Sequence, residues 1–361
     1  MLSIIGIFAN SMKASYHKYV LRFKRPSGTS RGILIEKETW FLVLESDDGS
    51  GLGECGILRG LSFDDRPDYE EKLKWACTNI ALGKQKLSRE LNDYPSIKFG
   101  LEQAFLSLRS KNMFHLFPSD FLSAEIPIAI NGLVWMGDRD FMFEQIEQKL
   151  NEGFSCIKMK IGAIDFETEL GLLRYIRKQF PKEEIEIRVD ANGAFTTDGA
   201  MRKLEILASL DLHSIEQPIK PGQWEAMALL CEKSPLPIAL DEELIGITDV
   251  TKRRELVQTV NPQYIILKPS LLGGFVESEN WIALAEEHGV GWWATSALES
   301  NIGLNAIAQW TYTLNNKLPQ GLGTGSLFTN NFDSPLIVEN GKLFYRKGLS
   351  WQADIIKTIC T

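Results

Sequence analysis

Carboxylates and lysines follow five apolar segments in the middle of the chain, each at the point where the segment ends. These residues are Lys158 and Lys160, Asp190 and Asn192, Glu216, Asp241, and Lys268. If the segments are parallel strands of one barrel, their carboxyl ends meet at the same mouth and bring these side chains together. Carboxylates that converge repel one another unless a cation lies among them. The pattern therefore predicts a metal site with lysines beside it.

The type of ligand indicates which ion the site would take. Asp190, Glu216 and Asp241 offer only carboxylate oxygens, which suit Mg2+, with Mn2+ as the alternative. No His or Cys stands at these strand ends, which disfavours zinc and copper. Glu242 and Glu243 are further candidate ligands, but residues beyond a strand end are more often solvated. A single Asp after a strand is more often a helix N-cap, whereas three carboxylates in series favour a metal site.

The lysines predict a proton-transfer reaction. Lys158 and Lys160 are two residues apart on one strand, so both point to the same face. Lys268 lies four strands further on, halfway round an eight-stranded barrel, and should face Lys160 across the metal. A lysine beside Mg2+ and a second ammonium group should have a lowered pKa and can act as a general base. The alternative is that Lys158 and Lys160 only pair with the carboxylates, and a supporting role suits Lys158 best.

These groups define a common enolisation step. Lys160 would remove the proton next to a metal-bound carboxylate, and Lys268 would stabilise the resulting enediolate. Reprotonation would then give racemisation, whereas loss of a β-group would give elimination.

The elements that must position these residues recur along the chain. Eight short apolar segments end 25 to 30 residues apart, with helical stretches between them, which predicts an α/β protein with a (β/α)8 barrel. A doubly wound sheet is disfavoured because no glycine-rich phosphate turn is present. The predicted strands are Ile126–Asn131, Cys156–Lys160, Glu186–Asp190, Leu212–Glu216, Pro237–Asp241, Tyr264–Lys268, Gly291–Ser296 and Leu318–Gly323.

The sequence before the barrel has a different pattern, with strands followed by helices. It predicts an α+β capping domain of residues 1–125, a barrel of residues 126–325, and a C-terminal segment of residues 326–361 that packs on the capping domain. The predicted capping elements are strands at Tyr16–Phe23 and Thr39–Leu44, a flexible loop at Arg25–Gly32, turn residues at 47–54 where a third strand would start, and helices at Tyr69–Ala81 and Ile97–Arg109.

Composition excludes several classes of protein. The 361 residues are 44% hydrophobic and 24% charged, with a net charge of −8. A disordered chain would have fewer apolar residues, and a nucleic-acid-binding protein would be more basic. No apolar run approaches the ~18 residues of a membrane helix. We predict a cytoplasmic protein whose partner is a small-molecule carboxylate, while its oligomeric state cannot be predicted.

The cysteines and the chain start give two smaller predictions. The five cysteines are an odd number without regular spacing, so we expect small core residues in a reducing compartment. Residues 1–11 are apolar and lack a basic region. They suggest an unprocessed or over-extended start ahead of Met12 rather than a signal peptide.

Taken together, these features resemble the enolase superfamily over nearly the whole chain. The Lys-x-Lys, Asp/Glu/Asp and strand-six lysine set resembles its muconate-lactonising subgroup. The mandelate-racemase subgroup would carry a His on strand seven, and Ala294–Gly303 contains none. Dipeptide epimerases would carry Asp-x-Asp at strand eight, and Gly321–Gly325 contains no acid. The remaining pattern is similar to the o-succinylbenzoate synthase family, supported by Ser296–Ser300, the 321–328 stretch and the 27–32 loop.

The resemblance implies a lyase and assigns roles to the residues. Its members dehydrate 2-succinyl-6-hydroxy-2,4-cyclohexadiene-1-carboxylate to o-succinylbenzoate in menaquinone biosynthesis, with Mg2+. By this resemblance the metal ligands are Asp190, Glu216 and Asp241, Lys160 is the acid and base, and Lys268 stabilises the intermediate, with a cation–π contact to the substrate ring as one way of doing so.

The resemblance also suggests substrate-binding residues, each with a plainer alternative. Gly321, Gly323 and the glycine at 325 would let backbone N–H groups approach a substrate carboxylate, or form a turn. Ser296 would line the pocket or pack in the barrel, and Asn192 would orient the metal ligands or cap a helix. Arg31 would shield the succinyl carboxylate or be a solvated loop residue.

Two other functions remain open from the sequence. One is an N-acylamino-acid racemase or cycloisomerase on the same scaffold. The other is a non-catalytic barrel that binds an anion, which the two opposed lysines disfavour.

Overall fold

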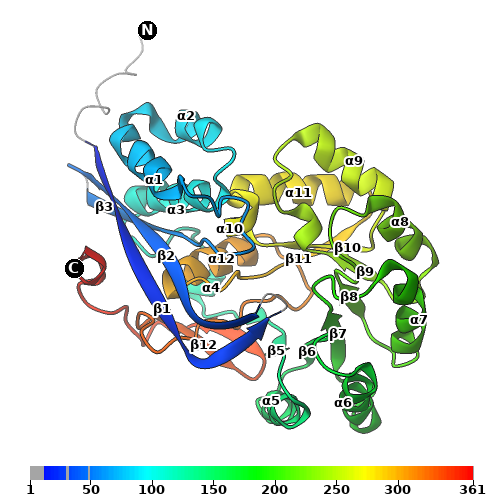
Figure 1. Ribbon diagram of the computed structural model, residues 1–361. Helices are drawn as coiled ribbons and strands as arrows, with labels where there is room; N and C mark the ends of the chain where they lie inside the picture. Colours follow the sequence, from blue (N-terminus) through cyan, green and yellow to red (C-terminus); the bar gives the residue numbers. More distant parts are fainter. Residues whose placement is uncertain (1–11, 30–31, 48, 361) are drawn as a thin grey trace.

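The computed structural model describes residues 12–29, 32–47 and 49–360, and places a long antiparallel hairpin beside a curled parallel sheet (Figure 1). The predictions for residues 1–11 and for Arg31 lie outside the described residues. The hairpin belongs to a sheet in the order β1-β2-β3. Its strands are β1 (Lys13–Thr29), β2 (Gly32–Ser46) and β3 (Gly49–Cys55).

Three helices cover this N-terminal sheet, namely α1 (Tyr69–Thr78), α2 (Gly83–Glu90) and α3 (Pro95–Arg109). Helix α3 packs unusually close to β3, because a Cβ atom at Gly53 would lie 1.9 Å from the carbonyl oxygen of Gly100. Buried side chains from both layers, including Trp40, Leu42 and Leu101, form the core between them. The strands-then-helices prediction for this region is confirmed.

The predicted flexible loop at Arg25–Gly32 is wrong over most of its length. The strands β1 and β2 extend into it, and after an irregularity between Arg22 and Ser27 they pair again at Gly28↔Ile33. The turn residues proline, serine and glycine suggested a loop there. The structure accommodates them in a hairpin arm, where a ladder can tolerate a bulge and proline.

The parallel sheet has seven strands in the order β11-β10-β9-β8-β7-β6-β5. In chain order they are β5 (Gly132–Val134), β6 (Cys156–Lys160), β7 (Glu186–Asp190), β8 (Ser214–Glu216), β9 (Ile238–Leu240), β10 (Tyr264–Leu267) and β11 (Gly291–Ala294). Helices follow these strands along the chain, and Figure 1 shows α5 to α9 on the outside of the sheet. They are α5 (Arg139–Asn151), α6 (Phe166–Gln179), α7 (Thr197–Ala208), α8 (Trp224–Lys233), α9 (Val250–Val260), α10 (Pro269–Leu272), α11 (Phe275–Glu287) and α12 (Asn301–Thr313).

The barrel prediction is confirmed, but its first and last strands differ in detail. Residues 318–323 form isolated parallel bridges, Ile130↔Gln320 and Thr295↔Gly321, which close the sheet between its two ends. The predicted first strand at Ile126–Asn131 is divided. Its middle is β4 (Ile128–Ala129), which pairs with a C-terminal strand, and the barrel strand β5 begins only at Gly132.

The C-terminal part contacts the start of the barrel and then returns to the N-terminal sheet. It contains β12 (Leu336–Glu339), β13 (Lys342–Tyr345) and α13 (Ile355–Cys360), and β13 pairs with β4 beside the short helix α4 (Asp120–Ser123). Ile355 and Ile359 of α13 pack with Phe41 and Val43 of β2. The last segment thus contains both strands and a helix.

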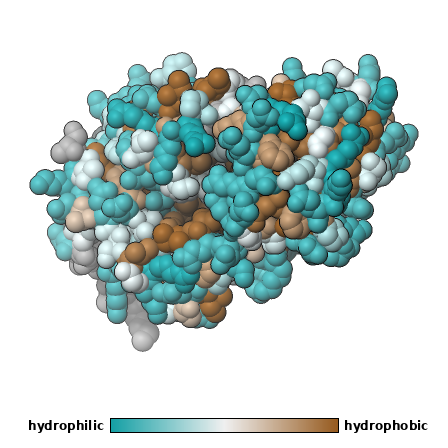
Figure 2. All heavy atoms as spheres, turned by 90° about the horizontal axis from the view of Figure 1, so that it is seen from below, coloured by the Kyte–Doolittle hydropathy of each residue, from teal (hydrophilic) through white to brown (hydrophobic). Residues whose placement is uncertain are grey.

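One face of the molecule is mainly polar (Figure 2). Among the described residues, no helix is long and apolar enough to cross a membrane. The face in Figure 2 is mostly hydrophilic, with hydrophobic residues in separate patches.

All five cysteines are free. Cys55, Cys156 and Cys231 are buried as predicted, whereas Cys77 is half-buried and Cys360 is exposed, so the prediction of core residues is wrong for Cys360.

Candidate active site

Strand register aligns three of the predicted site residues in one row. Lys160 of β6 pairs with Asp190 of β7, and Asp190 pairs with Glu216 of β8. Asp241 follows β9 directly, and Lys268 follows β10. The five side chains therefore gather at the carboxyl ends of neighbouring strands, as the sequence pattern predicted.

Ion pairs link the lysines and the carboxylates. Lys158 Nζ lies 3.1 Å from Asp190 Oδ2 and also contacts Glu216 Oε2. Lys160 Nζ lies 3.0 Å from Asp190 Oδ2, and Lys268 Nζ contacts Asp241 Oδ2. All three carboxylates are buried, with Asp190 only 1% exposed. Burial makes these pairs strongly dependent on one another, because a buried charge that loses its partner is poorly screened by solvent.

Burial and neighbouring charges together set the protonation of these groups. Burial opposes ionisation of Asp190, but Lys158 and Lys160 outweigh it and hold the pKa of Asp190 well below its usual range. Burial, and then the Asp190 charge, raise the pKa of Glu216 to about 8. Burial opposes the ammonium form of Lys268, yet carboxylates led by Asp241 raise its pKa. A raised pKa keeps Lys268 charged, which is the state that the sequence analysis expects of a group that stabilises the enediolate.

The same carboxylates can be tested as metal ligands. Within the described part of the chain, no three Asp, Glu, His or Cys groups form a ready-made metal cluster, and lysine ammonium groups contact all three carboxylates instead. However, Glu216 Oε1 is buried and has no hydrogen-bond partner among the described residues. A buried carboxylate oxygen without a donor is a suitable ligand for a hard cation. The donor set, with this unpartnered carboxylate oxygen, therefore fits a divalent metal.

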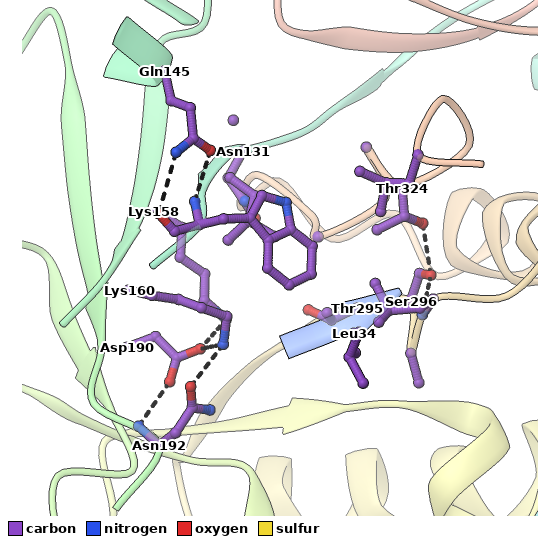
Figure 3. A pocket seen from close by; sticks show the side chains of 18 of the residues that line it. Leu34, Asn131, Gln145, Lys158, Lys160, Asp190, Asn192, Thr295, Ser296 and Thr324 are labelled. Atoms are coloured by element: carbon purple, nitrogen blue, oxygen red, sulfur yellow. Dashed lines mark hydrogen bonds and ion pairs between the residues drawn. The ribbon is translucent and has the colours of Figure 1, made fainter. Parts of the chain in front are cut away.

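A cavity of about 530 Å3 opens above this row, between the barrel mouth and the N-terminal hairpin. Lys158, Lys160, Asp190, Asn192 and Lys268 line it, whereas Glu216 and Asp241 do not. In Figure 3, Lys160, Asp190 and Asn192 lie on one side of the cavity and Ser296 and Thr324 on the other. The two lysines of the Lys-x-Lys strand thus share one face, as their spacing predicted.

Asn192 supports Lys160 and does not cap a helix. Its Oδ1 accepts a hydrogen bond of 2.7 Å from Lys160 Nζ, and its Nδ2 donates one of 2.9 Å to Glu242 Oε1. Helix α7 has Thr196 as its N-cap instead. Glu242 and Glu243 are both buried, so the prediction that they are solvated is wrong. Glu243 accepts hydrogen bonds from Gln217 and from the backbone of Gly222.

The predicted substrate-binding residues have mixed outcomes. Ser296, Gly321 and Gly323 line the cavity, but the N–H of Gly321 donates to the carbonyl oxygen of Ala294 at 2.8 Å. That N–H closes the barrel and cannot bind a carboxylate, which corrects the expectation. A glycine is required there because a Cβ atom would lie 2.4 Å from Thr295 Oγ1. Gly325 does not line the cavity.

The sequence pattern missed the apolar wall of the cavity. Leu34 of the hairpin, Leu58 and Trp135 line it, together with the basic residues Lys24 and Arg25. Trp135 directly follows β5, so a correct first strand would have found it. Leu34 and Arg25 lie in the stretch that we expected to be a loop, and no local pattern shows that this arm reaches the barrel mouth.

Comparisons with known proteins agree with this geometry. The family described as "Enolase C-terminal domain-like" matches residues 142–354, which is more than half of the chain. The chain therefore belongs to the enolase superfamily, whose members use a divalent metal.

Particular relatives narrow the similarity. The chain is 46% identical to an o-succinylbenzoate synthase of Desulfotalea psychrophila, over 92% of this chain and 99% of that protein. It superposes on a crystal structure described as MenC from Desulfotalea psychrophila with a TM-score of 0.82 and 43% identity, covering 93% of this chain and 100% of that one. A muconate lactonizing enzyme of Pseudomonas fluorescens has a TM-score of 0.83 at 23% identity, covering 97% and 99% of the two chains, and shows the shared fold.

Proposed function

We propose that this chain is a lyase that dehydrates 2-succinyl-6-hydroxy-2,4-cyclohexadiene-1-carboxylate to o-succinylbenzoate, a step of menaquinone biosynthesis. The observation that carries the proposal is the row of buried carboxylates with lysines on either side, at the base of one cavity of about 530 Å3. Similarity to an o-succinylbenzoate synthase over nearly the full length of both chains supports this substrate over others. An anion-binding module would have no need of an arrangement that places two lysines around buried carboxylates.

Asp190, Glu216 and Asp241 would hold the divalent metal, which we propose is Mg2+. When bound, the metal supplies positive charge that acidifies the proton next to a substrate carboxylate. The unpartnered Glu216 Oε1 supports this assignment. Lys158 contacts two of the three ligands, so its supporting role is to neutralise part of their negative charge.

Lys160 would transfer the proton. Its Nζ donates hydrogen bonds to Asp190 and Asn192 at the cavity wall, and these bonds fix the orientation of the side chain. Neutral Lys160 takes the proton from C1 of the substrate, and the protonated form then returns it to the departing hydroxide. The C–H and C–O bonds break, one water leaves, and the ring becomes aromatic. Lys268, on the opposite side of the barrel mouth, stays charged and stabilises the enediolate.

The rest of the cavity supports a substrate with an apolar ring and no amino group. Leu34, Leu58 and Trp135 offer an apolar wall, while the Gly321–Gly325 stretch has no acidic side chain to bind an ammonium group. The basic residues Lys24 and Arg25 line the same cavity, and their charge suits a dicarboxylate substrate.

Metal-dependent turnover tests the proposal. The purified chain is treated with EDTA, incubated with the cyclohexadiene substrate, and then supplied with Mg2+ or Mn2+. We expect o-succinylbenzoate to form only after metal is restored. Full activity in EDTA would contradict the metal assignment, and failure to form product with either metal would contradict the function.

A further inference from the structure

A buried charge cluster lies between the N-terminal sheet and the barrel, behind one wall of the cavity. It consists of Lys37 of β2, Glu54 of β3, and Glu299 of the segment between β11 and α12. Their exposed fractions are 3%, 0% and 0%. Burying three charges is costly unless each has a partner. None of the three takes part in the chemistry described above, so the cluster requires its own explanation.

Glu54 connects the N-terminal sheet to a barrel helix. Its Oε1 accepts a hydrogen bond of 3.0 Å from the backbone N–H of Ser300, and its Oε2 accepts one of 3.0 Å from Gly303 N–H. The hydroxyls of Thr39 and Ser300 also donate to it. A carboxylate at the first turn of α12 stabilises that helix. Glu54 is fully satisfied by these four donors and fixes the turn at 296–300.

Glu299 connects two parts of the active site. Its Oε1 accepts a hydrogen bond of 2.5 Å from Ser270 Oγ, and Ser270 belongs to α10, whose N-cap is Lys268. Its Oε2 accepts hydrogen bonds of 2.7 Å from Ser296 Oγ and from Ala297 N. One carboxylate therefore joins the turn that follows Lys268 to the serine that lines the cavity.

The hydroxyl hydrogens can be assigned from this arrangement. Ser296 has a single hydroxyl hydrogen, and an ionised carboxylate can only accept, so this hydrogen is committed to Glu299. The bond of 2.8 Å between Ser296 Oγ and Thr324 Oγ1 must then use the hydrogen of Thr324. The donors run from Thr324 to Ser296 to Glu299, on the side of the cavity away from Lys160 (Figure 3). Ser296 Oγ also accepts from the backbone N–H of Leu298 at 3.1 Å, so with Glu299 ionised the acceptor that this pair offers to the cavity is Thr324 Oγ1.

Lys37 supplies the positive charge of the cluster. Its Nζ is buried and has no hydrogen-bond partner among the described residues. Burial lowers the pKa of Lys37, and the charges of Glu54 and Glu299 oppose that effect. Burial likewise raises the pKa of Glu299, and the charge of Lys37 opposes it. The net effect is a raised pKa for Glu299 and a lowered pKa for Lys37, and each charge reduces the effect of burial on the other group.

We propose that Glu299 is a positioning residue that fixes both the Ser296–Thr324 hydroxyl pair and the α10 turn that follows Lys268, and that the buried Lys37 ammonium group balances its charge. Glu299 acts through these residues and does not touch the substrate itself. The inference rests on the proposed function for its kinetic test, while the hydrogen bonds on which it depends can be tested without any substrate.

The kinetic test uses Glu299→Gln, Lys37→Met and the double variant, with Glu102→Gln as the matched control. Glu102 is 2% exposed and accepts a backbone hydrogen bond of 2.6 Å from Phe275, but does not line the cavity. We expect each single variant to lose about tenfold or more in kcat/KM, since a charged buried hydrogen-bond acceptor or its counter-ion is removed. The double variant should be no worse than either single one, because one cation and one anion are removed together. Glu102→Gln should stay within about threefold of the unmodified chain.

A second variant separates the two arms of Glu299. Ser270 does not line the cavity, so Ser270→Ala should lower kcat while leaving KM within about threefold, as expected for an effect on Lys268 alone. This variant leaves the carboxylate and its cation in place, so it keeps the proposal testable if Glu299→Gln does not fold.

Amide hydrogen exchange gives the readout that needs no substrate. In Glu299→Gln, or in Ser270→Ala if the former does not fold, exchange should become faster in residues 268–272, and in Glu102→Gln it should not. Unchanged exchange there, or kcat/KM within about threefold of the unmodified chain for both Glu299→Gln and Ser270→Ala, would overturn the inference. If the unmodified chain forms no o-succinylbenzoate, the proposed function is wrong, and the exchange result alone decides the positioning role.

Discussion

Substitution of the two opposed lysines by alanine and by arginine separates a base from a fixed positive charge. Arginine keeps the charge but cannot lose a proton in a protein. If Lys160 is the base, Lys160→Arg should be as inactive as Lys160→Ala. If Lys268 acts only by its charge, Lys268→Arg should retain more activity than Lys268→Ala.

The structure allows the sizes of these losses to be worked out. Lys158 cannot replace Lys160, because its ammonium group is buried between Asp190 and Glu216. Removal of Lys160 should therefore cost the full contribution of a general base, about 10²–10⁴ in rate, with the upper end expected here. Asp190 keeps its ion pair of 3.1 Å with Lys158, so Lys160→Ala should still fold and bind metal. Lys268→Ala removes a preorganised charge and should cost about 10²–10³.

Single-turnover kinetics with substrate deuterated at C1 measures the chemical step. The unmodified chain should show a primary isotope effect, and neither Lys160 variant should form product at a rate above about 1% of normal. A Lys160→Ala variant near the normal rate would refute the base assignment. Equal loss in Lys268→Arg and Lys268→Ala would refute the charge-only role of Lys268.

The remaining predictions concern the metal and the choice of substrate. Glu216 has a pKa of about 8 without metal, so below that pH it carries a proton that a cation must displace. The Mg2+ affinity measured by calorimetry should therefore rise about tenfold per pH unit from pH 6 to 8 and then level off. An affinity that does not change with pH would contradict the assignment of Glu216 as a ligand. Asp190→Asn, Glu216→Gln and Asp241→Asn should each abolish turnover with unchanged circular dichroism. Because the pKa of Glu216 is higher in the folded than in the unfolded chain, this group lowers the stability of the fold as the pH rises above its unfolded pKa. Glu216→Gln should therefore melt no lower than the unmodified chain at pH 7. A clearly lower Tm would contradict the raised pKa of Glu216. The chain should not epimerise Ala-Glu dipeptides, as shown by chiral analysis, because strand eight offers no acid to their amino group.

Much of the catalytic arrangement could be predicted from the sequence because it depends on local features. Asp190, Glu216 and Lys268 each end an apolar segment, and parallel strands of a barrel bring such ends together whatever the loops do. The contacts of Lys158 and Lys160 with carboxylates also follow from their shared face. The Lys-x-Lys spacing and the repeat of 25 to 30 residues are visible without any tertiary information.

The parts that could not be predicted depend on contacts between distant segments. The extension of the hairpin through Arg25 is stabilised by pairing and by packing on the barrel, which overrides the turn propensity of its residues. The first barrel strand begins later than predicted, because the residues of β4 pair with β13, more than 200 residues away along the chain. The link from Glu299 to Ser270 likewise joins segments that no sequence pattern connects.

The most direct test of the central claim compares two reactions of the purified, Mg2+-loaded chain. The cyclohexadiene substrate is supplied in one experiment and an N-succinylamino acid in D2O in the other, and products are followed by absorbance and mass spectrometry. The account predicts rapid loss of one water and formation of o-succinylbenzoate, with Lys160→Ala inactive. No aromatic product, together with efficient deuterium exchange into the N-succinylamino acid, would contradict the dehydratase function and favour a racemase on the same scaffold.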